Sequence, residues 1–372
     1  MSKLKILECF GGIGACSKAL ERLGIDYEIA DYVEIDKYAV KSFNAIHGTN
    51  FEPQDITKWD KDIKVDLIMH GSPCQDFSLA GKQAGGDKDS GTRSSLMYET
   101  IRIVEKLKPK YVIWENVKNL LSKKHRHNFD AYLETMEQLG YTNYYQVLNA
   151  KDYGIPQNRE RVFTVSILDN QTEKDEKISL IVKDFKFPPK QELKLKLKDM
   201  LEDDVDEKYY LSESKIQKIA NWRAYQKPFE KVQGKNSIVP TLTARGAGEE
   251  HSGMITYSEN LEDTTNLQEE CLKVGLFDDT SSNSFAKGKR DYGYKNEYGT
   301  LKCSPKYSIY KNTDLRIRKL TPKEVWRLMG FDDEDFEKAA KVNSNSQLYK
   351  QAGNSIVVNV LEAILNNLLN QK

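Results

Sequence analysis

The chain has 372 residues, and its 56 basic and 56 acidic side chains give a formal net charge of zero. This length exceeds the usual size of one domain, so we expect two. The balanced charge excludes binding of a polyanion by bulk positive charge and leaves only a local basic surface for that purpose. The five cysteines lack paired metal-ligand spacing, so we expect no metal. Their odd number argues against a disulfide scaffold. No signal peptide or long apolar run opens the chain, which predicts a cytoplasmic protein without membrane association.

The N-terminal segment reads as a strand over 4–10, a glycine turn over 11–14 and a helix to about residue 23. Such a turn lets a ligand approach the backbone closely and leaves amides at the helix N-terminus free. The next strand ends at Glu34, where dinucleotide-like folds place a carboxylate on ribose hydroxyls, and Asp55 ends a third element. Taken alone, each of these acids is more typical of a solvated loop residue.

Cys74 lies just beyond an apolar run, 65–69, that reads as a buried strand. Gly71 and Pro73 predict a sharp turn that would hold this thiol at the crevice where ligands bind in open α/β sheets. The polar, glycine-rich stretch 76–95 that follows is typical of a lid or a binding loop. A buried structural cysteine beside a loop explains the same pattern equally well.

The chain then continues as an alternation of helices and strands, which we place at 96–107 (helix), 111–114 (strand), 129–139 (helix), 144–148 and 162–167 (strands). The strand at 111–114 runs directly into Glu115, another carboxylate at a strand's end. Between the last two strands, Arg159 and Arg161 would point the same way in an extended segment. This pair is suited to gripping an anion or a carbonyl oxygen; the alternative is a surface ion-pair cluster with Glu160.

After Leu168 charged runs replace this alternation, so we place a domain boundary there. Thr241-Leu242 and Thr300-Leu301 share a two-residue core within the second region, too short to define a repeat. The basic stretch 287–323 is interleaved with tyrosines, which makes it the best candidate to face nucleic acid. An ordinary solvated face accounts for the same composition.

Regular structure returns near the C-terminus. Thr321 and Pro322 predict the N-cap and first residue of a short helix that reaches Met329. An amphipathic helix is predicted over 357–369. The preceding Gln351–Ser355 segment is suited either to completing a ligand site or to capping that helix.

Nine motifs occur in the order typical of the DNA (cytosine-5) methyltransferase family, which the chain resembles over nearly its whole length. They are Phe10-Gly11-Gly12-Ile13-Gly14, Glu34-Ile35-Asp36, Asp55-Ile56, Gly71-Ser72-Pro73-Cys74-Gln75, Leu96-Met97-Tyr98-Glu99, Glu115-Asn116-Val117, Gln157-Asn158-Arg159-Glu160-Arg161, Arg318 to Phe331 and Gln351-Ala352-Gly353-Asn354-Ser355. Gly11 replaces a more frequent alanine and Met97 a common aromatic residue; both changes are conservative in size.

The resemblance implies an α/β, doubly wound (Rossmann-like) methyltransferase catalytic domain with a smaller inserted target-recognition domain. We expect the catalytic domain at 1–185, completed by 346–372, the recognition domain at 186–315, and a connecting segment at 316–345. The implied reaction is transfer of a methyl group from S-adenosylmethionine, yielding S-adenosylhomocysteine, to C5 of a cytosine flipped out of duplex DNA. A monomer is expected, and both pairing with a restriction endonuclease and phage self-modification remain open.

The resemblance also assigns residues. The catalytic set is Cys74 as the nucleophile toward C6, Glu115 as proton donor at N3, and Arg161 at O2 with Arg159 in support. The cofactor set is Phe10, Gly11, Gly12, Ile13, Gly14, Glu34, Ile35, Asp55, Ile56, Pro73, Leu96, Asn354 and Ser355. We expect DNA contacts from Gln75, Ser78, Lys82, Gln83, Arg93, Thr241, Leu242, Arg245, Thr300 and Leu301. The recognised sequence and the base that removes the C5 proton stay unassigned.

Three rival functions account for part of the pattern. A tRNA cytosine methyltransferase shares the chemistry, but segment 186–315 is larger than a compact tRNA-binding insert. A dehydrogenase explains the glycine turn and Glu34 but leaves Cys74, Glu115 and Arg161 without a role. A non-catalytic DNA-binding protein has no need to retain the thiol, the acid and the arginines together. A methyl-transfer assay separates the last two from the enzyme.

Overall fold

The computed structural model describes residues 3–73, 96–169, 185–212, 232–242, 256–258 and 317–370. The chain divides into two compact units. Unit 1 comprises Met1–Glu202, Ile238–Met254 and Thr321–Lys372, and unit 2 comprises Asp203–Ser237 and Ile255–Leu320.

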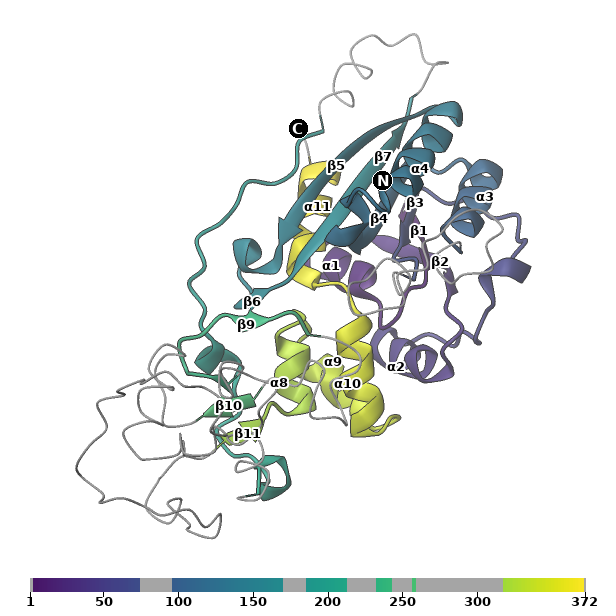
Figure 1. The fold of residues 1–372 in the computed structure, drawn as a ribbon. Helices are drawn as coiled ribbons and strands as arrows, with labels where there is room; N and C mark the ends of the chain where they lie inside the picture. The colour runs from purple at the N-terminus through teal and green to yellow at the C-terminus, as the bar shows by residue number, and fades with distance from the viewer. Residues whose placement is uncertain are drawn as a thin grey trace, which may run out of the picture. The chain divides into compact units, whose positions relative to one another are not determined.

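A six-stranded sheet forms the centre of unit 1, in the order β2-β1-β3-β4-β7-β5 (Figure 1). Its strands are β1 (Leu4–Cys9), β2 (Tyr27–Val33), β3 (Leu67–His70), β4 (Tyr111–Val117), β5 (Tyr141–Asn149) and β7 (Glu160–Leu168). The first four strands run parallel, whereas β7 is antiparallel to both β4 and β5. The strand order changes direction at β1, since β2 lies on one side of it and β3 and β4 lie on the other. In such sheets, ligands bind beyond the carboxyl ends of the strands at this point.

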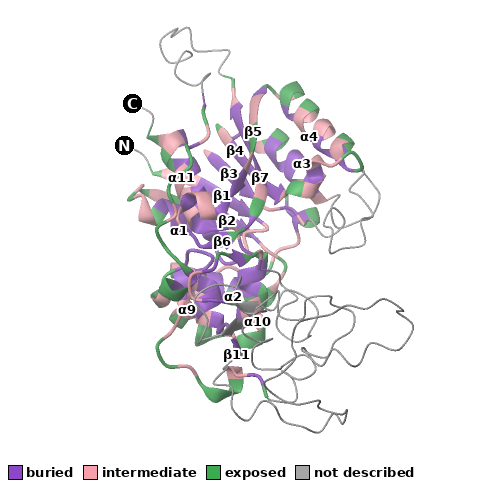
Figure 2. Cartoon of the chain, turned by 60° about the vertical axis from the view of Figure 1, so that its left-hand side comes forward, coloured by how far each residue is buried: buried purple, intermediate pink, exposed green. Residues whose placement is uncertain are grey.

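Helices cover both faces of this sheet, as the predicted doubly wound α/β fold requires (Figure 2). On one face lie α3 (Met97–Leu107) and α4 (Arg126–Gln138); on the other lie α1 (Ala15–Arg22) and α11 (Val358–Leu369). The remaining helices of unit 1 are α2 (Lys37–His47), α8 (Pro322–Arg327), α9 (Asp333–Ala340) and α10 (Asn345–Asn354). Buried apolar side chains of β1, β3 and β4 pack against α3 and α4 in one continuous core. The fold class predicted from the sequence is therefore confirmed.

A buried lysine ties the two ends of unit 1 together. Lys18 on α1 is 5% exposed, and its ammonium lies 2.8 Å from Asp332 and 3.1 Å from Asp335, at the start of α9. A charge this deeply buried requires close opposite charges, and both carboxylates here come from the far end of the sequence. The C-terminal part of unit 1 thus begins well before residue 346, where we expected the C-terminal part of the catalytic domain to begin.

The expected domain boundaries also differ from the compact units on the N-terminal side of the insertion. Residues 185–202 belong to unit 1: the Tyr153 hydroxyl donates to the Pro188 carbonyl at 3.0 Å, and Lys190 lies 3.0 Å from Asp152. A second passage of the chain returns at β9 (Val239–Pro240), which pairs in parallel with β6 (Gln157–Asn158). Such long-range contacts leave no signal in local composition.

Unit 2 contains a small sheet in the order β11-β10-β8. Strand β10 (Thr256–Ser258) is antiparallel to β11 (Ile317–Lys319) and parallel to β8 (Val232–Gln233). A further bridge joins Tyr210 to Arg318. Of the basic, tyrosine-rich stretch predicted at 287–323, residues 287–316 lie outside the described residues, as do Arg245, Thr300 and Leu301.

Residues 345–369 are long and apolar enough, by length and composition, to cross a membrane. In the structure they form two separate helices, α10 and α11, and half of the apolar window is buried inside the protein. The core helices of globular proteins pass the same test, and α11 packs against α1 as such a helix does.

Candidate functional site

The glycine turn after β1 has a backbone that other residues could not adopt without strain. Gly14 has a φ of +82°, and a Cβ atom there would lie 2.1 Å from the His47 imidazole. A Cβ atom at Gly11 would lie 2.7 Å from the Tyr32 ring. The Tyr32 hydroxyl in turn donates to the Gly12 carbonyl at 2.6 Å. His47 of α2 and Tyr32 of β2 therefore pack closely against the turn and leave no room for side chains at Gly11 and Gly14.

One amide in the first turn of α1, that of Ser17, is not free, contrary to the expectation from the sequence. The Glu8 carboxylate accepts the Ser17 backbone N–H at 3.1 Å and also binds the Ser17 hydroxyl. Gly14 at the N-cap has no side chain to do so, and Glu8 from β1 serves instead. Burial raises the pKa of Glu8 to about 7. An acid at this position disfavours a phosphate group, which dinucleotide sites place at the same helix end.

A second carboxylate, Glu34, closes the other side of the turn. Its two oxygens accept the backbone N–H groups of Gly12 at 3.2 Å and Asp36 at 2.8 Å. Burial raises the pKa of Glu34, while these two hydrogen bonds lower it. The Glu34 carbonyl accepts the Gln54 N–H at 2.8 Å, which brings Asp55 and Ile56 beside the loop. Ile35 is 69% exposed and offers an apolar surface next to the carboxylate.

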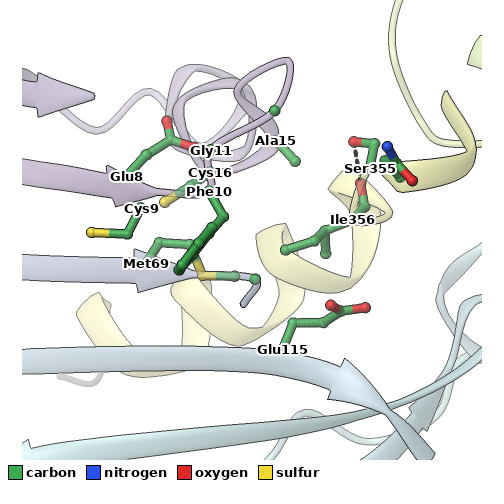
Figure 3. A pocket seen from close by; sticks show the side chains of 13 residues that line it. Glu8, Cys9, Phe10, Gly11, Ala15, Cys16, Met69, Glu115, Ser355 and Ile356 are labelled. Atoms are coloured by element: carbon green, nitrogen blue, oxygen red, sulfur yellow. Dashed lines mark hydrogen bonds between the residues drawn. The ribbon is translucent and has the colours of Figure 1, made fainter. Parts of the chain in front are cut away.

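The pocket beside the turn gathers residues from distant parts of the chain (Figure 3). Its lining consists of Glu8, Cys9, Phe10, Gly11, Gly12, Ala15, Cys16, Met69, Gly71, Glu115, Asn354, Ser355 and Ile356. Five of the predicted cofactor residues and the predicted acid Glu115 are in this set. Glu34, Ile35, Asp55 and Ile56 lie on the neighbouring loops, and Pro73 and Leu96 are described but not in this lining.

Sequence patterns missed several pocket residues, among them Met69, Gly71 and Ile356. Met69 lies near the carboxyl end of β3, and Gly71 directly follows that strand. The convergence of parallel strand ends was a usable signal for these two, since they precede Cys74. Ile356 follows the α10 helix, which the sequence did not predict. Asn354 lies at the end of α10 and Ser355 is its C-cap, so this segment completes the pocket and does not cap α11.

Glu115 and Arg161 form an ion pair at the edge of the pocket. The Arg161 Nε lies 3.1 Å from a Glu115 carboxylate oxygen, and both side chains are largely buried. Their strands are antiparallel neighbours, with Glu115 opposite Phe163 and Arg161 opposite Val117. Glu115 lies within β4, not beyond its end, and faces the pocket from the side opposite the glycine turn (Figure 3). An acid and a guanidinium are thus placed together at the edge of the pocket.

Arg159 serves a different purpose from Arg161, so the two do not form the expected gripping pair. The Arg159 side chain is 4% exposed and donates to the backbone carbonyls of Leu242 at 2.9 Å, Ser355 at 2.8 Å and Gly353 at 3.3 Å. Gln157 supports the same junction, because its amide accepts the Leu242 N–H at 3.3 Å and donates to the Leu328 carbonyl at 2.8 Å. Arg159 therefore holds the pocket wall in place.

The predicted DNA-contacting residues are only partly within the structure. Thr241 donates its hydroxyl to the Asn158 carbonyl at 2.8 Å, and the Leu242 side chain is 4% exposed, so Leu242 packs inside unit 1. Gln75, Ser78, Lys82, Gln83 and Arg93 lie outside the described residues, and so does Cys74 itself. Cys9 and Cys16 line the pocket, but burial raises the pKa of both thiols, which makes them poor nucleophiles. Among the described residues no group of side chains is arranged to hold a metal ion.

Glu8 predicts a pH dependence of stability. Its pKa is about 7 in the folded protein against 4.5 for an ordinary glutamate, so the folded state binds a proton that the unfolded state releases between these values. Stability is lost as the pH rises through this window. The free energy of unfolding of Glu8→Gln, measured relative to that of the unchanged protein, should therefore be about 3 kcal/mol higher at pH 8 than at pH 4.5. Urea denaturation at both pH values measures this difference, with Glu28→Gln on the neighbouring strand as an exposed control. An equal difference at both pH values would contradict the assignment.

Comparison with known proteins places this chain in a family. The family model for C-5 cytosine-specific DNA methylase matches residues 4–370. The orphan methyltransferase M.SPBetaI of Bacillus phage SPbeta is 33% identical, covering 99% of this chain and 98% of its own. The type II methyltransferase M2.ScrFI of Lactococcus lactis subsp. cremoris is 34% identical, covering 98% and 99%.

Solved structures agree in fold. A mutant of Spodoptera frugiperda DNMT2 superposes with a TM-score of 0.69 at 22% identity, covering 98% of this chain and 99% of its own. The Entamoeba histolytica methyltransferase EhMeth has a TM-score of 0.69 at 16% identity, covering 100% and 99%. At such identities the likeness concerns the fold alone, and it extends over the whole chain.

Proposed function

This chain belongs to the C-5 cytosine-specific DNA methylase family and is a DNA cytosine methyltransferase, and we propose that it methylates C5 of a cytosine flipped out of duplex DNA through a covalent bond between Cys74 and C6. The observation that carries the proposal is the shared pocket. Glu115, the glycine turn, Ser355 and Gly71, three residues before Cys74, all line it. Acid, cofactor cradle and the turn toward the nucleophile therefore meet at one place.

The residues of the pocket suit S-adenosylmethionine, which the family uses as its methyl donor. Glu8 and Glu34 accept backbone N–H groups of Ser17 and Gly12, which the phosphates of a dinucleotide would otherwise bind. Glu34 and Ile35 would hold the ribose and adenine with Asp55 and Ile56. When bound, the sulfonium of this cofactor supplies the methyl group and leaves as the neutral thioether of S-adenosylhomocysteine.

In the proposed mechanism, the electron pair of the Cys74 thiolate forms a bond to C6, and the displaced π electrons of the C5–C6 double bond make C5 nucleophilic. Glu115 donates a proton to N3 as the thiolate adds, and Arg161 stabilises the negative charge that develops on O2. After C5 has taken the methyl group, a base removes the C5 proton. The electrons of that C–H bond form the C5–C6 double bond, and the C6–S bond breaks to release the thiolate. N3 returns its proton to Glu115, which restores the acid. We assign Arg159 to positioning, since its donors are directed at backbone carbonyls.

We propose that unit 2, with its sheet and the chain around it, recognises the DNA sequence. No residue that we connect to the chemistry lies in unit 2, whose bounds are 203–237 and 255–320. Segment 238–242 is held by Gln157 and Arg159 and should not be exchanged with it. The enzyme is proposed to act in the cytoplasm as a monomer. Relatives named as type II and as phage orphan methyltransferases support either a restriction-modification or a self-modification role.

Conversion sequencing of host DNA tests this proposal. The chain is expressed in a host that lacks cytosine methylation, and 5-methylcytosine is mapped across the genome. We expect one short motif to be modified throughout. Replacing 203–237 and 255–320 with the matching segments of a relative of known specificity should move the methylation to that relative's motif, because base contacts specify the site. Persistence of the original motif in an active exchange variant would refute the role of unit 2, and scattered methylation would refute site specificity.

A further inference from the structure

Two side chains of β4 bind the turn between β3 and Cys74, and the shorter of the two hydrogen bonds comes from Trp114. The Trp114 indole N–H donates to the Ser72 hydroxyl at 2.9 Å, and the Asn116 amide donates to the Ser72 carbonyl at 3.4 Å. Ser72 is 4% exposed and Trp114 is 1% exposed, so neither hydrogen bond is shared with bulk water. Ser72 is two residues from Cys74, and Pro73 between them has a fixed φ. A displacement of Ser72 is therefore passed on to the residue that carries the thiol.

Trp114 is itself immobilised by rings on several sides. The His70 imidazole stacks parallel to it at 5.7 Å between ring centroids, and the Tyr132 ring lies 4.1 Å away. Phe129 stacks on it at 5.9 Å. His70 in turn contacts the Tyr132 hydroxyl at 3.2 Å, and burial lowers the pKa of His70 to about 3, so the ring stays neutral. The indole N–H is thus a donor in a fixed position, as a precise anchor requires.

The turn also lies beside the acid that we assign to catalysis. A Cβ atom at Gly71 would lie 3.6 Å from Ile356 and 3.9 Å from a Glu115 carboxylate oxygen. Trp114 and Glu115 are consecutive residues of β4, and His70 pairs with Trp114 across the parallel strands. The hydrogen bond from Trp114 to Ser72 therefore sets the turn against the same strand that presents Glu115 to the pocket.

We propose that Trp114 and Ser72 are a pair of positioning residues that fix the turn before Cys74 relative to Glu115, so that the thiol meets C6 while the acid meets N3. Neither side chain touches the base. The proposal rests on Cys74 as the nucleophile. It differs from a purely structural role, because a hydrogen bond that only stabilises the fold would leave the reaction rate of the folded enzyme unchanged.

Three variants test the pair: Ser72→Ala, Trp114→Phe and the double variant. The measured quantity is the rate at which each folded enzyme forms a denaturation-resistant adduct with duplex DNA containing 5-fluorocytosine, at saturating S-adenosylmethionine. We expect each single variant to form the adduct about tenfold more slowly, because the turn is then no longer held where the thiol reaches C6. The double variant should be no slower than the slower single variant, because each removes the same interaction. Dissociation constants for DNA and S-adenosylmethionine should stay within about twofold.

Trp326→Phe is the matched control, because it also removes a buried indole hydrogen bond, to the Leu348 carbonyl at 3.0 Å, within the C-terminal helices of unit 1. Thermal unfolding of all variants identifies any loss of fold. Single variants that react within about twofold of the unchanged enzyme, independent losses that multiply in the double variant, or equal slowing by Trp326→Phe would each overturn the inference. If the unchanged enzyme binds both ligands but forms no adduct, the nucleophile proposal fails first, and this inference fails with it.

Discussion

Replacing Cys74 by serine is expected to abolish the covalent adduct with 5-fluorocytosine DNA and to lower the methylation rate by at least about 10⁴-fold. The thiolate is a far better nucleophile at neutral pH than the serine hydroxyl, and without addition at C6 the C5 carbon does not become reactive. Fluorine at C5 blocks the final elimination, so the unchanged enzyme stays bonded to its substrate. Denaturing electrophoresis after incubation with S-adenosylmethionine detects the bond.

The control for this experiment is Cys271→Ser, which removes a thiol from unit 2, to which we assign DNA recognition but no step of the chemistry. At saturating DNA it should still form the adduct, because the bond to C6 does not require this thiol. Cys9 and Cys16 are unsuitable controls because both line the pocket. An adduct formed by the Cys74→Ser variant would show that another group attacks C6, and the assignment of the nucleophile would be wrong.

Glu115→Gln should lower kcat by about 10² to 10⁴-fold while the dissociation constant for S-adenosylmethionine stays unchanged. Glutamine keeps the shape of the side chain and its hydrogen-bonding capacity but has no proton to give to N3. The carboxylate is needed most as the thiolate adds, so the loss belongs in turnover. Single-turnover kinetics with saturating DNA and cofactor separate this step from binding.

Glu160→Gln is a matched control, because Glu160 is on the next strand and pairs at the surface with Lys118 at 3.0 Å. It removes a carboxylate beside Arg161 without touching the pocket and should retain full turnover. Equal activity of Glu115→Gln and the unchanged enzyme at every pH would refute a proton-donor role. The Arg161–Glu115 ion pair would then be a device for holding Arg161 alone.

Local patterns were sufficient to predict most of the sheet and its glycine turn. The strand predicted at 4–10 corresponds to β1, and the strand predicted to run into Glu34 corresponds to β2. Thr321 and Pro322 begin α8 as predicted. In each case neighbours in sequence carry the information: the hydrophobic period, a cap or a glycine. Gly140, which follows the helix predicted at 129–139, has a φ of +91° directly after the C-cap of α4.

The side-chain partners within the site were not predictable in this way. Arg159 binds the Ser355 carbonyl across 196 residues of sequence, and Glu8 binds Ser17 because one strand happens to face the helix that follows it. The spacing of the arginines predicted that Arg159 and Arg161 point the same way. In the structure Arg159 lies at the break between β6 and β7, whereas Arg161 lies within β7, and the two side chains bind different partners. Residue type restricts what a side chain can bind, whereas only the packed structure decides which partner it meets.

The central claim is that this chain methylates cytosine in duplex DNA through Cys74, and direct methyl transfer to competing substrates tests it most directly. The purified enzyme is incubated with S-adenosylmethionine carrying a labelled methyl group and with equal amounts of genomic duplex DNA and tRNA, and the labelled nucleosides are identified by mass spectrometry. We predict labelled 5-methylcytosine in the DNA, none in the tRNA, and none in either with Cys74→Ser. Label confined to tRNA, or DNA label that persists in the Cys74→Ser variant, would contradict the claim.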